Sequence, residues 1–164
     1  MKIMLAVDGS SYTRFAARSL VDHLGWFAGQ PEIHLVHVQP PLPYPAAQSV
    51  VGKQVVHDYQ RGESLNALAV AEAELTPGGI PFRSEWRVGE VTSELALYAK
   101  ENGIDLVVMG SHGHGALAGL ALGSIATKLI ATLTVPILVV RAPRLPGVQP
   151  RDHEAARQPA NLPR

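Results

Sequence analysis

The segment Gly110-Ser-His-Gly-His-Gly-Ala-Leu-Ala-Gly-Leu-Ala-Leu-Gly-Ser124 decides how the rest of the chain is interpreted. It holds five glycines in fifteen residues, between a strand-like run, Ile104–Met109, and a helix-like run, Ser124–Ala131. Glycines are kept where a side chain would collide or where φ must be positive. A strand, a glycine-rich loop and a helix N-terminus are typical of phosphate sites, because backbone N–H groups and the helix dipole converge there. The segment predicts a nucleotide site; the alternative is a flexible Gly/Ala surface loop.

Strands and helices alternate on both sides of this segment. Helices are expected after Asp8-Gly9-Ser10-Ser11, over 51–75, from Glu90 to about Asn102 and from Ser124 to about Leu133. The alternation predicts an α/β fold with a single doubly wound, five-stranded parallel sheet, Rossmann-like, of order 3-2-1-4-5 and with helices on both faces. The expected strands are Lys2–Val7, Glu32–Val38, Phe82–Val88, Ile104–Met109 and Pro136–Arg141.

The chain divides into one domain and a tail. Its 164 residues suit a single domain, which we place at 1–142. Residues 143–164 are polar and contain five prolines, so we expect them to be disordered. Four prolines in Gln39–Ala46 predict a long loop after the second strand.

Composition excludes several function classes. Lys and Arg together number 14, as do Asp and Glu, so no broad basic field is available for nucleic acid or an anionic membrane. The chain has no cysteine, which excludes disulfides, thiolate metal sites and thiol catalysis. No apolar run approaches the ~18 residues of a membrane span, and the N-terminus does not resemble a signal peptide. We therefore expect a cytoplasmic protein.

The predicted strand order also locates a ligand crevice. Ligands of open parallel sheets bind beyond the carboxyl ends of the strands, where the strand order reverses. In the order 3-2-1-4-5 this point lies between the first and fourth strands. Asp8 and Gly110 follow these two strands, so we expect them to face each other across the crevice.

Two common nucleotide motifs do not match the loop. The dinucleotide fingerprint GxGxxG fails because Gly113 and Gly115 are followed by Gly119, one residue too late. The Walker P-loop fails because no lysine precedes Gly123-Ser124. What the loop does contain is Gly-x2-Gly-x9-Gly-Ser, formed by Gly110, Gly113, Gly123 and Ser124.

With this spacing the chain resembles the universal stress protein family, specifically its ATP-binding branch. The resemblance runs from Lys2 to about Arg141 and includes Val7-Asp8-Gly9-Ser10, Val108–Gly113 and Val135-Pro-Ile-Leu-Val-Val-Arg141. Family members that bind no nucleotide usually lack these glycines.

The resemblance implies a role for each matching residue. Asp8 would lie near the ribose and any metal-bridged phosphates, with helix capping as its alternative role, and it is the one candidate contact to a phosphate-bound Mg²⁺. Val38 would offer backbone groups to the adenine edge. Ser124 would give its hydroxyl and N–H to phosphate, or serve only as a helix N-cap. The implied nucleotide-binding set is Ala6, Val7, Asp8, Val38, Met109, Gly110, His112, Gly113, His114, Gly123, Ser124, Ile125 and Ala126.

His114 departs from many relatives, which carry Arg or Lys there. No Lys or Arg lies between Gly110 and Thr127, so a triphosphate would depend on backbone N–H groups and a divalent cation. A protonated His114 would strengthen triphosphate binding as the pH falls, unless it is simply a solvated loop histidine. His112 and His114 form a poor metal pair without a third ligand.

Catalysis has little support in the sequence. No Asp, Glu or Lys lies within Gly110–Ser124 to act on water near a γ-phosphate, and no Gly-x-Ser-x-Gly elbow occurs. The main hypothesis is a regulatory stress-response protein that binds ATP (or ADP or AMP) with at most slow hydrolysis. The alternatives are a dimeric interaction module of the same fold without nucleotide and, third, an adenylate-transferring enzyme.

The last predicted strand is an apolar sheet edge. An exposed edge of this kind pairs readily with another chain. The family resemblance implies antiparallel pairing across a two-fold axis, so Val135–Arg141 is the expected homodimer contact. The alternative is an edge covered by the proline-rich tail.

Overall fold

The computed structural model describes residues 1–41, 52–113 and 122–142. The elements follow in the order β1 (Lys2–Val7), α1 (Ser11–Asp22), β2 (Glu32–Gln39), α3 (Lys53–Leu75), β3 (Phe82–Val88), α4 (Val91–Asn102), β4 (Leu106–Gly110), α5 (Ser124–Thr132) and β5 (Ile137–Val140). Short 3-10 turns follow α1 at Leu24–Trp26 and α3 at Thr76–Gly78. The expected 143–164 tail lies outside the described residues.

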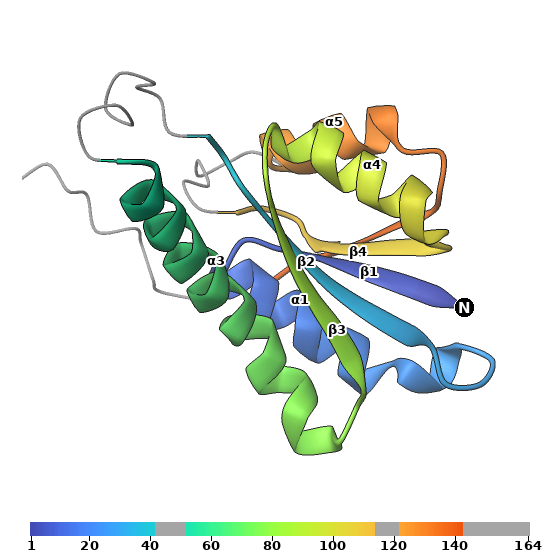
Figure 1. Cartoon of the computed structure of the whole chain (residues 1–164). Coiled ribbons are helices and arrows are strands. Elements are labelled where there is room, and N and C mark those ends of the chain that lie inside the picture. Colours follow the sequence, from blue (N-terminus) through green and yellow to red (C-terminus); the bar gives the residue numbers. More distant parts are fainter. Residues whose placement is uncertain (42–51, 114–121, 143–164) are drawn as a thin grey trace, which may run out of the picture.

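The five strands form one parallel sheet of order β3-β2-β1-β4-β5, which confirms the predicted topology (Figure 1). Strand β1 is central, with Val7 opposite His37 of β2 and Leu5 opposite Val108 of β4. All four connections are crossovers between parallel strands, as the alternating pattern requires. The carboxyl ends of β1, β2 and β4 therefore lie side by side at one edge of the sheet.

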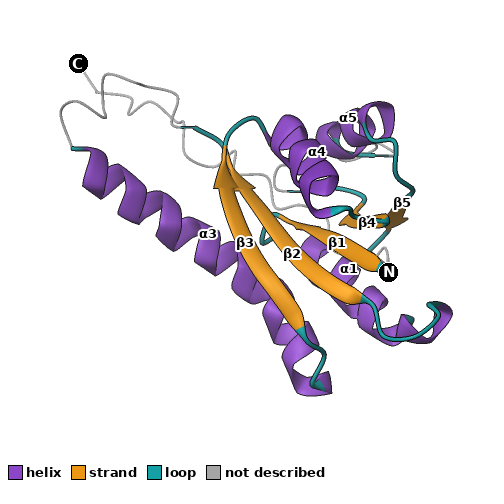
Figure 2. Ribbon diagram, turned by 45° about the vertical axis from the view of Figure 1, so that its right-hand side comes forward, coloured by secondary structure: helices purple, strands orange, loops and turns teal. Residues whose placement is uncertain are grey.

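Helices cover both faces of the sheet (Figure 2). Helices α1 and α3 pack against each other and against one face, over a core that includes Leu5, Leu35 and Leu68. Helices α4 and α5 cover the other face, over a second core that includes Met4, Tyr98 and Leu129. The near-continuous apolar runs of β1 and β2 follow from this arrangement, because both faces of these strands are buried.

The turn between β1 and α1 is shaped by Gly9. Its φ is +79°, and a Cβ atom there would lie 2.9 Å from Cα of Ala67 on α3. Glycine is therefore required twice, by the backbone conformation and by the close approach of α3. Ser10 then caps α1 by accepting a hydrogen bond from the Thr13 N–H.

Candidate functional site: a pocket at the carboxyl ends of the strands

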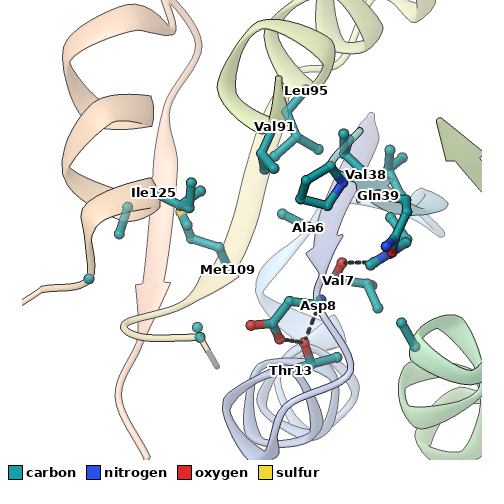
Figure 3. A pocket seen from close by; sticks show the side chains of 18 of the residues that line it. Ala6, Val7, Asp8, Thr13, Val38, Gln39, Val91, Leu95, Met109 and Ile125 are labelled. Atoms are coloured by element: carbon teal, nitrogen blue, oxygen red, sulfur yellow. Dashed lines mark hydrogen bonds between the residues drawn. The ribbon is translucent and has the colours of Figure 1, made fainter. Parts of the chain in front are cut away.

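A cavity of ≈ 620 Å³ opens where β1, β2 and β4 end (Figure 3). Twelve of the thirteen residues predicted from the sequence line it: Ala6, Val7, Asp8, Val38, Met109, Gly110, His112, Gly113, Gly123, Ser124, Ile125 and Ala126. The thirteenth, His114, lies outside the described residues. The predicted meeting of Asp8 and Gly110 is thus present in the fold.

One part of the cavity is apolar. Val36 and Val38 project from β2, Val91 and Leu95 from α4, and Met109 from β4. All five belong to, or pack against, the core beneath α4 and α5. Figure 3 shows Val91 and Leu95 on one side of the opening and Met109 and Ile125 on another. Such a wall suits a flat apolar group.

The other part is polar and is organised around Asp8. Its Oδ1 accepts hydrogen bonds from the Ser10 N–H (3.0 Å), the Ser10 hydroxyl (2.6 Å) and the Thr13 hydroxyl (2.7 Å). Its Oδ2 points at Gly113, where an added Cβ would collide with it. Asp8 therefore holds the start of α1 with one oxygen and faces the loop after β4 with the other, so the two roles proposed for it do not compete.

The three glycines of the motif are required for different reasons. A Cβ at Gly110 would lie 2.7 Å from Cβ and 3.0 Å from the carbonyl oxygen of Tyr12, so Gly110 permits α1 to pack against β4. Gly113 permits the approach of Asp8. At Gly123 an added Cβ would lie 3.3 Å from Cα of His112, a tight but adjustable contact. Two glycines are thus explained without a ligand, and the motif by itself says less about binding than the sequence suggested.

Helix α5 points its N-terminus into the cavity. Gly123 is the N-cap, so Ser124 is the first helical residue, and its interpretation as a mere N-cap is wrong. The Gly123 N–H donates to the Ser111 carbonyl (2.8 Å), which brings the start of α5 against the end of β4. The first N–H groups of a helix have no partner within it. Ser124, Ile125 and Ala126 carry these groups and all line the cavity.

His112 is held by contacts within the protein. Its Nδ1 lies 3.0 Å from the Ser111 hydroxyl, and its ring lies 5.2 Å from that of Tyr12. Among the described residues, no group of three or more His, Cys, Asp or Glu side chains is placed to hold a metal ion.

The charged side chains that line the cavity limit how it could bind a phosphate. Within the described part of the chain, the lining contains two carboxylates, Asp8 and Glu63, and neither Lys nor Arg. A polyphosphate would therefore meet backbone N–H groups and a helix dipole but no fixed positive side chain. Each such dipole contact is worth only about 0.3–2 kcal/mol, so a highly charged ligand needs a cation with it.

A model of the universal stress protein family matches residues 1–141. The chain belongs to the universal stress protein family. It is 32% identical over 143 residues to a universal stress protein of Thermus aquaticus, in an alignment that covers 85% of this chain and 97% of the relative.

Solved structures of universal stress proteins and their relatives share the fold. Protein MJ0577 of Methanocaldococcus jannaschii superimposes with a TM-score of 0.73 at 23% identity, covering 88% of this chain and 97% of that one. A universal stress protein of Arabidopsis thaliana with AMP bound gives 0.63 at 14% identity, covering 88% and 93%. Identities this low establish the fold alone. Among the described residues, no helix is both long and apolar enough to cross a membrane.

Sequence reasoning about this universal stress protein missed nine lining residues. They come from α1, β2 with its following loop, α3 and α4: Thr13, Val36, His37, Gln39, Pro40, Glu63, Ala67, Val91 and Leu95. Two signals were available: Val91 and Leu95 stand one helical turn apart beside a predicted strand end, as do Glu63 and Ala67. These spacings are the same for a cavity wall and for an ordinary core.

Proposed function

We propose that this universal stress protein binds an adenine nucleotide, ATP or its ADP and AMP counterparts, in the pocket at the carboxyl ends of β1, β2 and β4. The observation that carries the proposal is the order of surfaces across the cavity. The N-terminus of α5 and the end of β4 present N–H groups, the end of β1 presents Asp8, and β2 with α4 presents an apolar wall.

The N–H groups, Asp8 and the apolar wall follow one another in the same order as the phosphate, sugar and base of a nucleotide. Neighbouring strands lie about 4.8 Å apart, so the ends of β4 and β2 are separated by about 10 Å with β1 between them. Phosphate at Gly110–Gly113 and Ser124 places the sugar over β1, beside Asp8. The base then reaches Val38 and the apolar wall. A solved relative with AMP bound supports an adenine nucleotide as the ligand.

A divalent cation completes the proposal for ATP. The described lining has two carboxylates and no basic side chain, so Mg²⁺ carried by the phosphates would reduce their repulsion from Asp8. AMP, with fewer charges, needs this help less. The site binds and releases its nucleotide with at most slow hydrolysis, because Gly110–Ser124 supplies no Asp, Glu or Lys to act as a base.

We also propose a homodimer formed through Val135–Arg141, acting in stress adaptation in the cytoplasm. Strand β5 is at the edge of the sheet, beside β4 alone among the described strands. Its four residues are apolar and half-buried within one chain. Antiparallel pairing with a second copy would satisfy its outer N–H and C=O groups. The domain formed by 1–142 is the unit that dimerises.

The ligand can be tested on the purified protein. Denaturation followed by mass spectrometry of the released small molecules is expected to show an adenine nucleotide, and calorimetry with added Mg-ATP measures its affinity. Gly123→Val places a branched side chain against His112 and Ser111 at the start of α5, so it is expected to abolish binding while the thermal unfolding temperature changes little.

The control is Gly25→Val, where an added side chain meets open space. Retained affinity in Gly123→Val contradicts the assignment of the loop. No released nucleotide and no Mg-ATP binding would instead favour a dimeric interaction module of the same fold.

A further inference from the structure

His37 and Gln39 form a hydrogen-bonded pair at the edge of the cavity that the proposed function does not use. They are two residues apart on β2, so their side chains leave the same face of the strand. His37 is buried, with 7% of its surface exposed. Its Nδ1 lies 2.8 Å from the carbonyl oxygen of Val7, and its Nε2 lies 3.2 Å from Oε1 of Gln39.

The Val7 carbonyl determines where the imidazole carries its proton. A carbonyl oxygen only accepts hydrogen bonds, so the Nδ1 that faces it must be the N–H. A neutral imidazole has one N–H, which leaves Nε2 as an acceptor. Nε2 then requires a donor, and the nearby group is the Gln39 amide.

This requirement fixes the orientation of the Gln39 amide. The oxygen and nitrogen of a glutamine amide exchange places on a half-turn of the side chain, and the hydrogen-bond network decides between them. Beside a neutral His37 the amide turns its NH₂ to Nε2. Its carbonyl oxygen then faces away from His37, and Gln39 lines the cavity. In that orientation the carbonyl oxygen is the acceptor that the amide has left to offer to a ligand in the cavity.

The position of Gln39 indicates which part of the ligand meets that acceptor. Gln39 follows Val38 at the end of β2, two strands from the phosphate-binding end of β4 (Figure 3). Successive side chains of a strand leave opposite faces, so Val38 faces the α4 side of the sheet and Gln39 the α3 side, and both line the cavity. A base placed over the end of β2 therefore meets Val38 on one side and Gln39 on the other. We propose that Gln39 reads the exocyclic group at C6 of a purine and selects a 6-amino base over a 6-oxo base, with His37 as its positioning residue. This inference rests on the proposed function.

Selectivity follows from the unequal cost of the two bases. A 6-amino group donates a hydrogen bond to the Gln39 oxygen. A 6-oxo group brings a second acceptor to the same point and leaves both oxygens unpaired, a difference worth about tenfold in affinity. If the pair served only to satisfy a buried histidine, changing Gln39 would alter stability and leave base selectivity unchanged.

The experiment compares Mg-ATP with Mg-ITP by calorimetry at pH 8, where histidine is ordinarily neutral. These ligands differ only in the base, so contacts to sugar and phosphate cancel in the ratio of their dissociation constants. Gln39→Leu is expected to reduce the preference for ATP about tenfold. The matched control is Gln30→Leu, in an exposed residue before the opposite end of β2, which should leave the ratio unchanged.

His37→Asn tests the positioning role separately. Asparagine can place an amide N–H near the Nδ1 position and keep the bond to Val7, but it has no group at Nε2. It is therefore expected to lower the ATP preference about as much as Gln39→Leu, with the fold retained in thermal unfolding. The double variant should lose no more than either single variant, because the two residues act as one unit.

Three outcomes would contradict this inference, and they separate its failure from that of the proposed function. Unchanged ATP preference in Gln39→Leu, with ATP still bound, overturns the reading of the base by Gln39 and leaves nucleotide binding intact. Additive losses in the double variant overturn the coupling to His37. If the unmodified protein binds neither nucleotide, the proposed function fails and this inference fails with it.

Discussion

Gly113 lies so close to Asp8 that no side chain fits between its Cα and the Asp8 carboxylate. The loop after β4 therefore passes directly against the residue that follows β1, although the two are 105 positions apart in the sequence. Oδ1 of Asp8 accepts hydrogen bonds from Ser10 and from Thr13, and these bonds hold the carboxylate in one orientation. Figure 3 shows the contact between Asp8 and Thr13.

Exchanging the glycines for alanine should separate packing from binding. Gly110→Ala would force a methyl against the backbone of Tyr12, and we expect it to lower the free energy of unfolding by about 1–3 kcal/mol. Gly113→Ala would displace the loop from Asp8, so we expect at least about a tenfold loss of ATP affinity with a smaller effect on stability. Thermal unfolding and calorimetry measure the two effects. Unimpaired affinity in Gly113→Ala would contradict our placement of the phosphates.

Asp8→Asn should separate the charge of this residue from its capping role. The asparagine oxygen can accept the three hydrogen bonds now made to Oδ1, so stability should change by less than about 1 kcal/mol. Losing the negative charge should weaken the dependence of ATP affinity on Mg²⁺, measured by titrations with Mg²⁺ and with EDTA. Asp8→Ala is the comparison, since it also removes the acceptor and should cost about 1–3 kcal/mol of stability. Equal Mg²⁺ dependence in Asp8→Asn and the unmodified protein would rule out a contact between Asp8 and a phosphate-bound cation.

The dimer can be tested at one backbone N–H. The carbonyl of Pro136 accepts a hydrogen bond from the Val107 N–H of β4, and that of Val140 accepts one from the N–H of Ser111, just after β4. The alternation of a strand therefore turns the N–H of Val139 outward. Val139→Pro removes that outer donor and is expected to give a monomer in sedimentation velocity. Val139→Thr keeps the N–H and should remain dimeric. A dimeric Val139→Pro protein would place the interface elsewhere.

Stability at acid pH should depend on the cap of α4. The side chain of Glu90 accepts hydrogen bonds from the N–H and hydroxyl of Ser93, and these bonds lower the pKa of Glu90 below its ordinary value of 4.5. A lowered pKa in the folded state stabilises the protein above pH 4.5, and this contribution disappears as the pH falls through the lowered value. The unfolding temperatures of Glu90→Ala and the unmodified protein should therefore differ at pH 7, and the difference should be smaller at pH 3. A difference that is the same at both pH values would contradict a role for the ionised carboxylate.

The strand bounds show where sequence patterns are sufficient. The limits of β1 follow from the apolar run Lys2–Val7, which Asp8 ends, and the structure confirms them. Strand β4 begins at Leu106, two residues later than expected, because the Ile104 N–H donates to the Ala99 carbonyl. Ile104 thus follows the C-cap of α4, Gly103, whose φ is +63°, and its N–H closes the last turn of that helix. An apolar residue after a glycine looks the same in either role, so the pattern could not separate a helix end from a strand start.

The site was predictable where the backbone itself forms it. Segments after β1 and β4 and at the start of α5 carry residue types, Asp and Gly, that mark turns and close approaches. The contributions of α3 and α4 were not predictable, because Ala67 and Leu95 have the spacing of ordinary core residues. Their place in the cavity depends on how far each helix extends past the sheet, which is a property of tertiary packing.

The cavity draws its walls from both sides of the sheet, with Ala67 from the layer of α1 and α3 and Leu95 from the layer of α4 and α5. These layers are otherwise separated by the strands. A molecule occupying the hollow would touch both at once and would link their fluctuations, so that amide hydrogen exchange would slow in α3 and α4 together. Vacating the site would then loosen two distant surfaces simultaneously, and a second protein could sense the change on either side.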